Sequence, residues 1–273
     1  MSEPPTYEDV RVEVEGPVAR VVIDRPARLN ALRMTRTDRE LVDAFGWIER
    51  SDEIRAVILT GAGERAFCTG WDLEEVGDTT LMQLERLVRS NMDLFLKIWH
   101  LRQPVVAALN GYALGAGASM ALVCDLAIAA ESAKIGEPEI RHGALSPFPV
   151  LPFHTLVKPL HAFYYFGDMM DAETMLRLGL VNQVVPDGEL ETAAAAYAAR
   201  LAKVPPDLLQ TAKRSLRATY DAMGLQVAMR QHGIADTLAI AADTPDQRRL
   251  MDILARNGMR AFLEERDGPF RLP

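Results

Sequence analysis

Two glycine-containing loops and one glutamate are the residues whose types and spacing could do chemistry. The stretch NGYALGAGASM (110–120) places a G-x-G turn between an apolar run and a helical one, and Glu139 follows in GEPE. A strand that ends in a glycine turn and continues as a helix directs backbone N–H groups toward one point, which then attracts negative charge. The loop AFCTGWD (66–72) also follows an apolar run. The two loops predict an anion-binding site with one carboxylate nearby.

Three interpretations of the G-x-G turn stay open from spacing alone. A dinucleotide-binding fingerprint needs a third glycine where Met120 stands and an acid that closes a strand, whereas Glu139 follows Pro138 in a loop-like segment. An oxyanion hole needs two converging N–H donors, each of which commonly stabilises a transition state by about 3–4 kcal/mol. The loop at 66–72 could supply the second donor. Both loops could also be tight turns without chemistry.

The surrounding elements predict strands that alternate with helices. Residues 10–24 alternate in polarity and predict a β-hairpin, while 55–61 and 104–110 predict short buried strands. Thr35, with Asp38 three residues later, predicts a capped helix start. Further helices are predicted at 81–99, 191–204, 207–219, 221–241 and 244–265. The pattern predicts β-α crossover units followed by a C-terminal portion that is helical throughout.

The composition is that of an ordinary globular protein. Of 273 residues, 49% are hydrophobic and 25% are charged, and the formal net charge is −8. This acidic balance argues against a nucleic-acid partner. Cys68 and Cys124 are too few for a disulfide framework and lack metal-ligand spacing, which indicates a reducing compartment and no metal site. The first residues have no secretory pattern and Asn110 interrupts the apolar run 104–124, so we expect a cytoplasmic protein without a membrane span.

Six segments carry a more specific signal. In order along the chain they are RPARLNAL (25–32), AFCTGWDL (66–73), NGYALGAGASMALVCDLAIAA (110–130), GEPEIRHG (136–143), GDMMDAETMLRLGLVNQVV (167–185) and GMRAFLEERDGPF (258–270). Together they resemble the enoyl-CoA hydratase/isomerase family, the crotonase superfamily. The resemblance implies an α/β fold with a spiral core domain of β-β-α units over 1–200 and a helical trimerisation region over 201–273. It also implies a homotrimer, or a hexamer of two trimers.

The resemblance also implies roles for individual residues. Proteins of this family hold the thioester oxygen of an acyl-CoA with two backbone N–H groups, which match Trp71 and Ala116 here. The catalytic glutamate matches Glu139, and Ser119 stands at a second catalytic position. Substrate or CoA contacts are implied for Ala27, Leu29, Ala31, Ala66, Gly70, Asp72, Gly115 and Phe262. Asp72 is expected mainly to brace its loop, and Phe262 to pack against the CoA of a trimer neighbour.

Ser119 departs from the pattern of typical hydratases, which carry a second glutamate there and hold water between two carboxylates. A serine hydroxyl can hydrogen-bond water but is no base near neutral pH unaided. A single glutamate is similar to Δ3,Δ2-enoyl-CoA isomerases, in which one base moves a proton between carbons. A Ser/Glu pair is similar to hydroxycinnamoyl-CoA hydratase-lyases, but Val76 replaces one of their ring-gripping tyrosines. His142 could tune or replace the missing acid.

The segment SPFPVLPFHTL (146–156) is a second departure, because relatives begin a glycine-rich helix there. The sequence predicts a stiff, apolar wall of the acyl pocket from Pro147, Phe148, Pro149, Pro152 and Phe153. Pro147 also stands where hydroxyisobutyryl-CoA-type hydrolases carry an aspartate, which argues against thioester hydrolysis. His154 and His161 are expected to be structural.

The sequence therefore predicts an acyl-CoA enzyme that adds water to an unsaturated thioester, or removes it from a 3-hydroxyacyl thioester, through an oxyanion-stabilised enolate. Glu139 is the predicted general acid and base. Two alternatives stay open: isomerisation by the single glutamate, and a catalytically weak acyl-CoA-binding subunit. CoA arrives as part of the substrate, and no metal, other cofactor, nucleic acid or membrane partner is expected.

Overall fold

A β-hairpin begins the core, as the alternating residues of 10–24 predict. The computed structural model describes residues 3–75, 80–146, 153 and 157–271. In it, β1 (Val10–Glu15) pairs antiparallel with β2 (Val18–Ile23). β2 then pairs in parallel with β3 (Ala56–Gly61), which brings the hairpin into a larger sheet.

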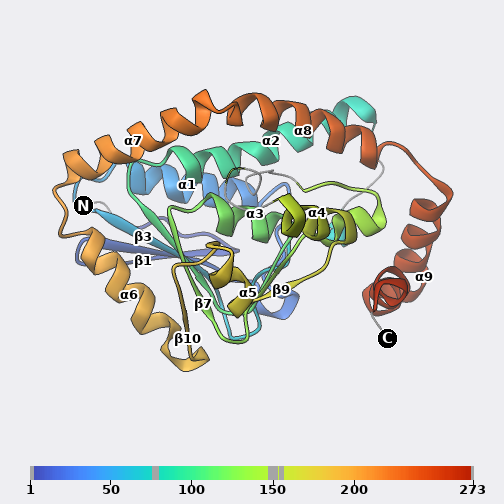
Figure 1. Cartoon of the computed structure of the whole chain (residues 1–273), viewed down its shortest axis with the longest axis horizontal. Coiled ribbons are helices and arrows are strands. Elements are labelled where there is room, and N and C mark those ends of the chain that lie inside the picture. Colours follow the sequence, from blue (N-terminus) through green and yellow to red (C-terminus); the bar gives the residue numbers. More distant parts are fainter. Residues whose placement is uncertain (1–2, 76–79, 147–152, 154–156, 272–273) are drawn as a thin grey trace.

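Repeated strand-strand-helix units follow the hairpin (Figure 1). They are β3 and β4 (Ala66–Cys68) before α2 (Leu81–His100), β5 (Val105–Leu109) and β6 (Tyr112–Leu114) before α3 (Ala116–Val123), and β7 (Leu126–Ala130) and β8 (Lys134–Gly136) before α4 (Val157–Phe166). β9 (Met170–Asp171), α5 (Ala172–Arg177), β10 (Gln183–Val185) and α6 (Leu190–Leu201) complete the core. The first strand of each unit joins the sheet β1-β2-β3-β5-β7-β10, and the second joins the sheet β4-β6-β8-β9. The predicted spiral of β-β-α units is confirmed.

Different helices cover the two faces of the larger sheet, because successive side chains of a strand point to opposite faces. Ile58 on β3 packs in one apolar cluster with Ala194 of α6. Its neighbour Val57 belongs to a second cluster with Phe45 of α1 (Thr37–Glu49) and Phe95 of α2. Figure 1 shows α6 on one side of the strands and α1 with α2 on the other. Burial on both faces explains why the strands read as continuous apolar runs.

α1 begins at Thr37, so the prediction of a cap at Thr35 is wrong. The Thr37 hydroxyl donates to Asp9 Oδ2 at 2.6 Å and ties the helix start to the beginning of the chain. The Asp38 carboxylate accepts a hydrogen bond from the Trp71 side chain instead of capping the helix. Tertiary partners therefore replace the local capping box that the spacing suggested.

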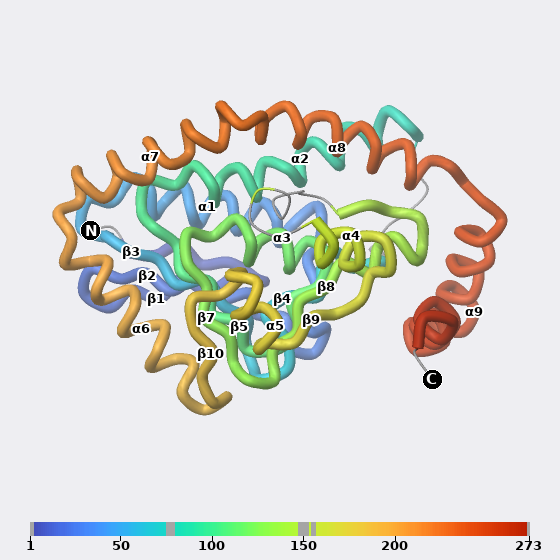
Figure 2. Tube along the Cα trace, in the orientation of Figure 1, coloured from blue at the N-terminus to red at the C-terminus, as the bar shows by residue number. Residues whose placement is uncertain are grey.

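The C-terminal portion is helical, as predicted. α7 (Pro206–Ala222) and α8 (Leu225–Ile240) lie nearly end to end along one side of the molecule, and α8 packs on α2 (Figure 2). α9 (Pro245–Asp267) has non-helical geometry at Gly258 and contacts the short helix η3 (Pro138–His142). The predicted boundary after residue 200 falls at the end of α6. The division into two domains stays a prediction.

Candidate active site

The glycine turn at Gly115 joins β6 to α3 and brings a carboxyl group against the backbone. Gly115 has a φ of +53°, a conformation that glycine adopts at least cost. A Cβ atom on this residue would also overlap Oε1 of Glu139, so the glutamate side chain lies directly against the turn. The N–H of Ala116 belongs to the first turn of α3, where backbone donors have no acceptor within the helix. The turn thus places an available donor beside Glu139.

The loop after β4 approaches the same turn. Leu32 and Trp71 form a parallel bridge, in which the Leu32 N–H donates to the Gly70 carbonyl at 2.8 Å and the Asp72 N–H donates to the Leu32 carbonyl at 2.9 Å. In such a pair the N–H of the bridged residue, here Trp71, points away from the partner. Gly70 has a φ of +87°, and a Cβ atom on it would stand 3.4 Å from the Ala116 nitrogen. The two glycine loops therefore meet.

The Trp71 side chain anchors its loop to α1. Its Nε1 donates to Asp38 Oδ2 at 3.1 Å, and its ring contacts Phe95 at a centroid distance of 6.2 Å. Asp38 is 4% exposed, and burial raises its pKa to about 7. Sequence reasoning missed this contact, because 33 residues separate the two side chains.

Asp72 and the segment 25–32 hold the other side of the loop. The Asp72 carboxylate accepts a hydrogen bond from Arg25 at 3.2 Å, which gives this side chain a bracing contact. The buried Asn30 amide donates to the carbonyls of Ala62 and Ala66, a link that sequence reasoning did not single out. Of the residues expected to contact CoA in this segment, Ala27 is exposed, Leu29 half-buried and Ala31 buried.

A second glutamate joins Glu139 in the site. Glu137 is 2% exposed, and its Oε1 accepts hydrogen bonds from Ser146 at 2.9 Å and from Ser119 at 3.3 Å. Ser119, predicted to be catalytic, thus has a carboxyl partner that sequence reasoning overlooked. The sequence contains a signal for it, because GEPE has two acids, of which only Glu139 belongs to the Pro-Glu pair.

The two carboxyl groups interact directly, which changes their proton affinity. Burial first, and then repulsion by Glu139, raises the pKa of Glu137 well above its usual range. Burial also raises the pKa of Glu139 to about 7, although Arg266 and a hydrogen bond from Glu137 oppose this shift. In the described part of the chain, no N–H or hydroxyl group donates to the buried Oε2 of either glutamate. The pair is therefore set up to retain a proton near neutral pH.

Helices α8 and α9 of the same chain close the site around η3. Asp236 on α8 accepts a hydrogen bond from the Leu145 N–H at 2.8 Å, and burial raises its pKa to about 6. Phe262 on α9 is fully buried, and its ring meets the edge of His142 at 5.8 Å. Burial lowers the pKa of His142 to about 4, so this ring is neutral at physiological pH. Packing of Phe262 against a neighbour's CoA stays a prediction.

Tyr164 on α4 adds a phenol that sequence reasoning missed. Its hydroxyl is buried, and the carboxyl groups of Glu137 and Glu139 add to the effect of burial in raising its pKa, which an interaction with Ser146 opposes. Phe153 is half-buried against the main apolar core, and His161 is exposed and stacks on Tyr165. The remaining candidates of that region, together with one earlier position, lie outside the described residues: Val76, Pro147, Phe148, Pro149, Pro152 and His154.

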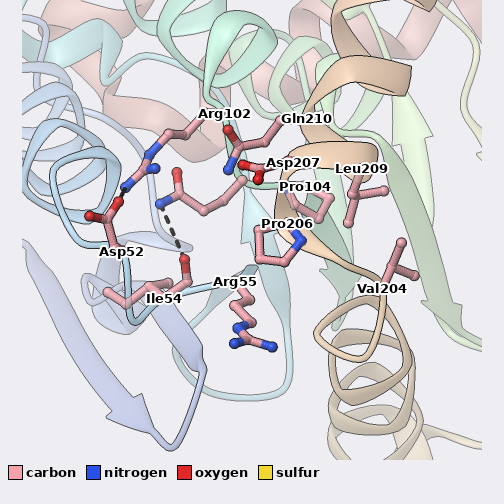
Figure 3. A pocket seen from close by; sticks show the side chains of 11 residues that line it. Asp52, Ile54, Arg55, Arg102, Pro104, Val204, Pro206, Asp207, Leu209 and Gln210 are labelled. Atoms are coloured by element: carbon pink, nitrogen blue, oxygen red, sulfur yellow. Dashed lines mark hydrogen bonds and ion pairs between the residues drawn. The ribbon is translucent and has the colours of Figure 1, made fainter.

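A surface pocket of about 320 Å³ lies elsewhere, at the amino ends of β3 and β5 (Figure 3). Its lining residues are Asp52, Ile54, Arg55, Arg102, Gln103, Pro104, Val204, Pro206, Asp207, Leu209 and Gln210. The glycine loops follow β4 and β6, which come after the opposite, carboxyl ends of β3 and β5 in the chain. The pocket shares no residue with these loops or with η3, and it is not part of the candidate site.

The described residues contain neither a membrane-spanning helix nor a metal-binding cluster. Within residues 3–75, 80–146, 153 and 157–271, no helix has the length and apolar character needed to cross a membrane. In the same ranges, no group of three or more His, Cys, Asp or Glu side chains is placed to hold a metal ion.

Comparisons with known proteins place the chain among acyl-CoA enzymes. A family model described as enoyl-CoA hydratase/isomerase matches residues 13–272. The (E)-benzylidenesuccinyl-CoA hydratase of Thauera aromatica is 32% identical over 270 residues, which are 96% of this chain and 98% of that protein. The short-chain-enoyl-CoA hydratase of Clostridium acetobutylicum is 32% identical over 94% of this chain and 95% of its own length. A crystal structure of an enoyl-CoA hydratase/isomerase from Xanthobacter autotrophicus Py2 superposes with a TM-score of 0.93 at 31% identity, covering 98% of this chain and 100% of that one.

Proposed function

The chain belongs to the enoyl-CoA hydratase/isomerase family, and from this premise we propose that it adds water across the C2=C3 double bond of an enoyl-CoA thioester, or catalyses the reverse reaction. The observation that carries the proposal is the contact of the Glu139 carboxyl with the Gly115 turn, beside the N–H of Ala116. A group that moves protons thus stands next to a donor that can hold a thioester oxygen. Similar relatives that are named hydratases support the same reaction.

The proposed reaction proceeds through an enolate. The N–H groups of Trp71 and Ala116 hold the thioester oxygen, so the electron pair of the double bond can move onto that oxygen as water attacks C3. Glu139 takes the proton from the water and returns a proton to C2 as the enolate collapses. CoA lies along the edge formed by residues 27–31. The reaction moves only water and protons, so it requires no redox cofactor.

The direct test follows the absorbance of the conjugated thioester. Added crotonyl-CoA should lose this absorbance as the 3-hydroxyacyl product forms, and Glu139→Gln should bind the same thioester with little turnover. An acyl-CoA-binding subunit without catalysis is the alternative from another class. Binding without any loss of absorbance, across a panel of enoyl-CoA thioesters, would establish that alternative and refute hydration.

A proline substitution tests the oxyanion site. Ala116→Pro removes the N–H from the first turn of α3, where proline is otherwise tolerated, and turnover should fall by about a hundredfold to a thousandfold. Ala116→Gly retains the N–H and should have a mild effect if the turn survives. Circular dichroism of both variants provides the folding control. Unchanged turnover in a folded proline variant would mean that the oxygen is held elsewhere.

Isomerisation of a 3-enoyl-CoA is the second candidate reaction. The specific observation in its favour is Ser119, which replaces the second carboxylate that typical hydratases use to hold water. A 3-enoyl-CoA substrate should gain conjugated absorbance if Glu139 moves a proton from C2 to C4. Faster isomerisation than hydration on matched acyl chains would reverse the order of the two candidates.

The acyl group of the substrate is best approached through the curated relatives. One is named for a substrate with an aromatic ring and a succinyl unit, and another for short chains. We propose that the acyl pocket accepts a substituted enoyl group, because the Tyr164 hydroxyl is buried beside Ser146 and the two carboxyl groups and can also hydrogen-bond a polar substituent. Mass spectrometry of a panel with crotonyl, cinnamoyl and carboxylate-bearing enoyl thioesters would test this.

The proposal includes a cytoplasmic homotrimer, or a hexamer of two trimers. The exposed apolar side chains of α7 and α8 support it, because such side chains gather where subunits meet. They are Leu208, Leu216, Val227, Ile234 and Leu238. Light scattering at micromolar concentration should give a mass of three or six chains, and a monomer would refute the assembly.

A further inference from the structure

We propose that Glu137 is a positioning residue that stays protonated at neutral pH and donates a hydrogen bond to the Glu139 carboxylate. This inference deepens the proposed function and, as far as catalysis is concerned, rests on it. The site would then contain two carboxyl groups of which only Glu139 faces the substrate. Glu137 would fix the orientation and charge of Glu139 from behind.

The hydrogen bonds of Glu137 determine which of its oxygens is available. Both serine hydroxyls, from Ser119 and Ser146, converge on Oε1, at 3.3 Å and 2.9 Å. Oε2 is buried and has no partner among the described groups. Ser119 occupies the position at which typical hydratases carry their second glutamate. The chain therefore supplies a carboxyl group to this place from the loop before η3 rather than from α3.

Glu139 is arranged in the complementary way. Its Oε1 lies against Gly115, where a side chain on the turn would overlap it, whereas its Oε2 is buried and receives no N–H or hydroxyl hydrogen bond from the described residues. Two ionised carboxylates have only acceptors and would leave both Oε2 atoms unsatisfied. One shared proton satisfies both oxygens at once, and it removes the repulsion between two buried like charges.

The surroundings of the pair indicate which glutamate holds the proton. Arg266 on α9 favours the ionised form of Glu139 and Asp236 on α8 opposes it, and the Tyr164 phenol on α4 interacts with both carboxyl groups. The groups that favour the ionised form of Glu137 are the hydroxyls of Ser146 and Ser119, whereas the Arg266 cation acts on Glu139. Glu139 consequently ionises first, with Glu137 as its donor, and the pair titrates as a unit.

The arrangement has a mechanistic consequence. A hydrogen bond from Glu137 to Oε2 leaves Oε1 of Glu139 as the single basic oxygen at the glycine turn. That oxygen can take the water proton as the C3–O bond forms and give a proton to C2 afterwards, and Glu137 keeps its own proton throughout. One substrate-facing carboxylate is then sufficient for hydration, provided that its partner stays neutral.

Infrared spectroscopy of the resting protein tests the protonation directly. The wild type at pH 8 should show the C=O stretch of a protonated carboxylic acid, and Glu137→Gln should lose this band. Glu131→Gln is the matched control, because Glu131 is exposed and its replacement should leave the band unchanged. Absence of the band from the wild type, or its persistence in Glu137→Gln, would overturn the inference.

The pH dependence of kcat/KM supplies a second readout. The wild type should lose activity at alkaline pH as Glu137 ionises, whereas Glu137→Gln, a permanently neutral donor, should keep activity within about threefold at pH 7.5 and lack this alkaline limb. Glu137→Ala should lower kcat by about tenfold to a hundredfold without changing the Kd for the acyl-CoA. An alkaline limb that is unchanged in Glu137→Gln would contradict the inference.

A third variant, at Ser146, tests the inference even if Glu137→Gln and Glu137→Ala fail to fold. Ser146→Ala removes the shorter hydrogen bond to Oε1 of Glu137, which favours the ionised form, so the alkaline limb should move to higher pH. A limb that does not move contradicts the inference. A wild type that shows the infrared band but hydrates none of the thioesters would refute the proposed function and leave the inference on Glu137 supported.

Discussion

Two of the groups of charged side chains in the interior of this protein compensate their charges in opposite ways. Around Asp125 the charges have opposite signs. Its Oδ2 accepts hydrogen bonds from Lys213 at 2.7 Å and from the Val105 N–H at 2.8 Å, and its Oδ1 accepts one from Arg217 at 3.0 Å. The Arg217 guanidinium also stacks on the Trp99 ring at 4.4 Å. Around Glu139, two groups of the same sign adjoin each other.

The difference indicates that the Asp125 group stabilises the fold, whereas the pair of glutamates is suited to acid-base chemistry. Lys213 and Arg217 lie on α7, so their bonds to Asp125 fix the C-terminal helices to the sheet without leaving either oxygen of the carboxylate unpaired. Glu137 and Glu139 each keep a buried oxygen to which no N–H or hydroxyl of the described residues donates. Burial of like charges destabilises a fold but moves pKa values toward neutrality, which acid-base catalysis requires. The comparison therefore predicts which substitutions affect activity and which affect stability.

The largest expected effect is on turnover. Glu139→Gln keeps the size of the side chain but removes the base, so kcat should fall by about a hundredfold to ten-thousandfold while acyl-CoA still binds. Asp125→Asn should leave kcat per folded molecule unchanged. Steady-state kinetics and isothermal titration calorimetry on both variants check this. Full activity of Glu139→Gln would remove it from the mechanism and make His142 the next residue to test.

The next effect is on stability, at the other group. Asp125→Ala leaves Lys213 and Arg217 buried without their counter-charge, so the free energy of unfolding should fall by about 3–5 kcal/mol. Arg89→Ala is the control, because Arg89 and Glu85 form an exposed pair one helical turn apart, and its loss should cost less than about 1 kcal/mol. Urea denaturation monitored by tryptophan fluorescence measures both. Equal losses would mean that burial of the Asp125 group has no special importance.

The third prediction concerns the dependence of stability on pH. The pKa of Glu139 rises from 4.5 to about 7 on folding, so the folded state binds the proton more tightly and stability falls as pH increases through this interval. Glu139→Gln removes this loss and should be more stable than the wild type at pH 8 by on the order of 1–3 kcal/mol. The gain should vanish below pH 4.5. A gain that is equal at pH 4 and pH 8 would contradict the assigned cause.

The sequence predicted the parts of the fold that depend on local patterns. The hairpin at 10–24, the buried strands at 55–61 and 104–110 and the C-terminal helices follow from periodicity and turn residues, and the structure confirms them. The start of α1 was missed because Thr37 bonds to Asp9, a partner 28 residues away. The spacing of neighbouring residues cannot reveal a contact between positions so far apart in the sequence.

The candidate site likewise contains residues that the sequence revealed and residues that it did not. The glycine turn and Glu139 stand out in the sequence, because glycine spacing and a resemblance to known motifs both mark them. Glu137 did not, since its significance depends on two serines that lie 18 and 9 residues away and meet only in the folded chain. The Tyr164 phenol was missed for the same reason. The residues that we propose to act on the substrate were easier to find than those that we propose to orient them.

The smallest expected effect distinguishes two roles for Ser119. If its hydroxyl only supports Glu137, Ser119→Ala removes the longer of two hydrogen bonds to Oε1, and hydration should slow by about twofold to tenfold, the equivalent of about 0.5–1.5 kcal/mol. The exposed Ser132→Ala serves as the control and should be silent. A loss near a hundredfold would instead indicate that Ser119 orients the attacking water, as its position in the family suggests. In that case the Ser119 hydroxyl would take part in the chemistry, and it would not serve only to hold a buried carboxyl group in place as the partners of Asp125 do.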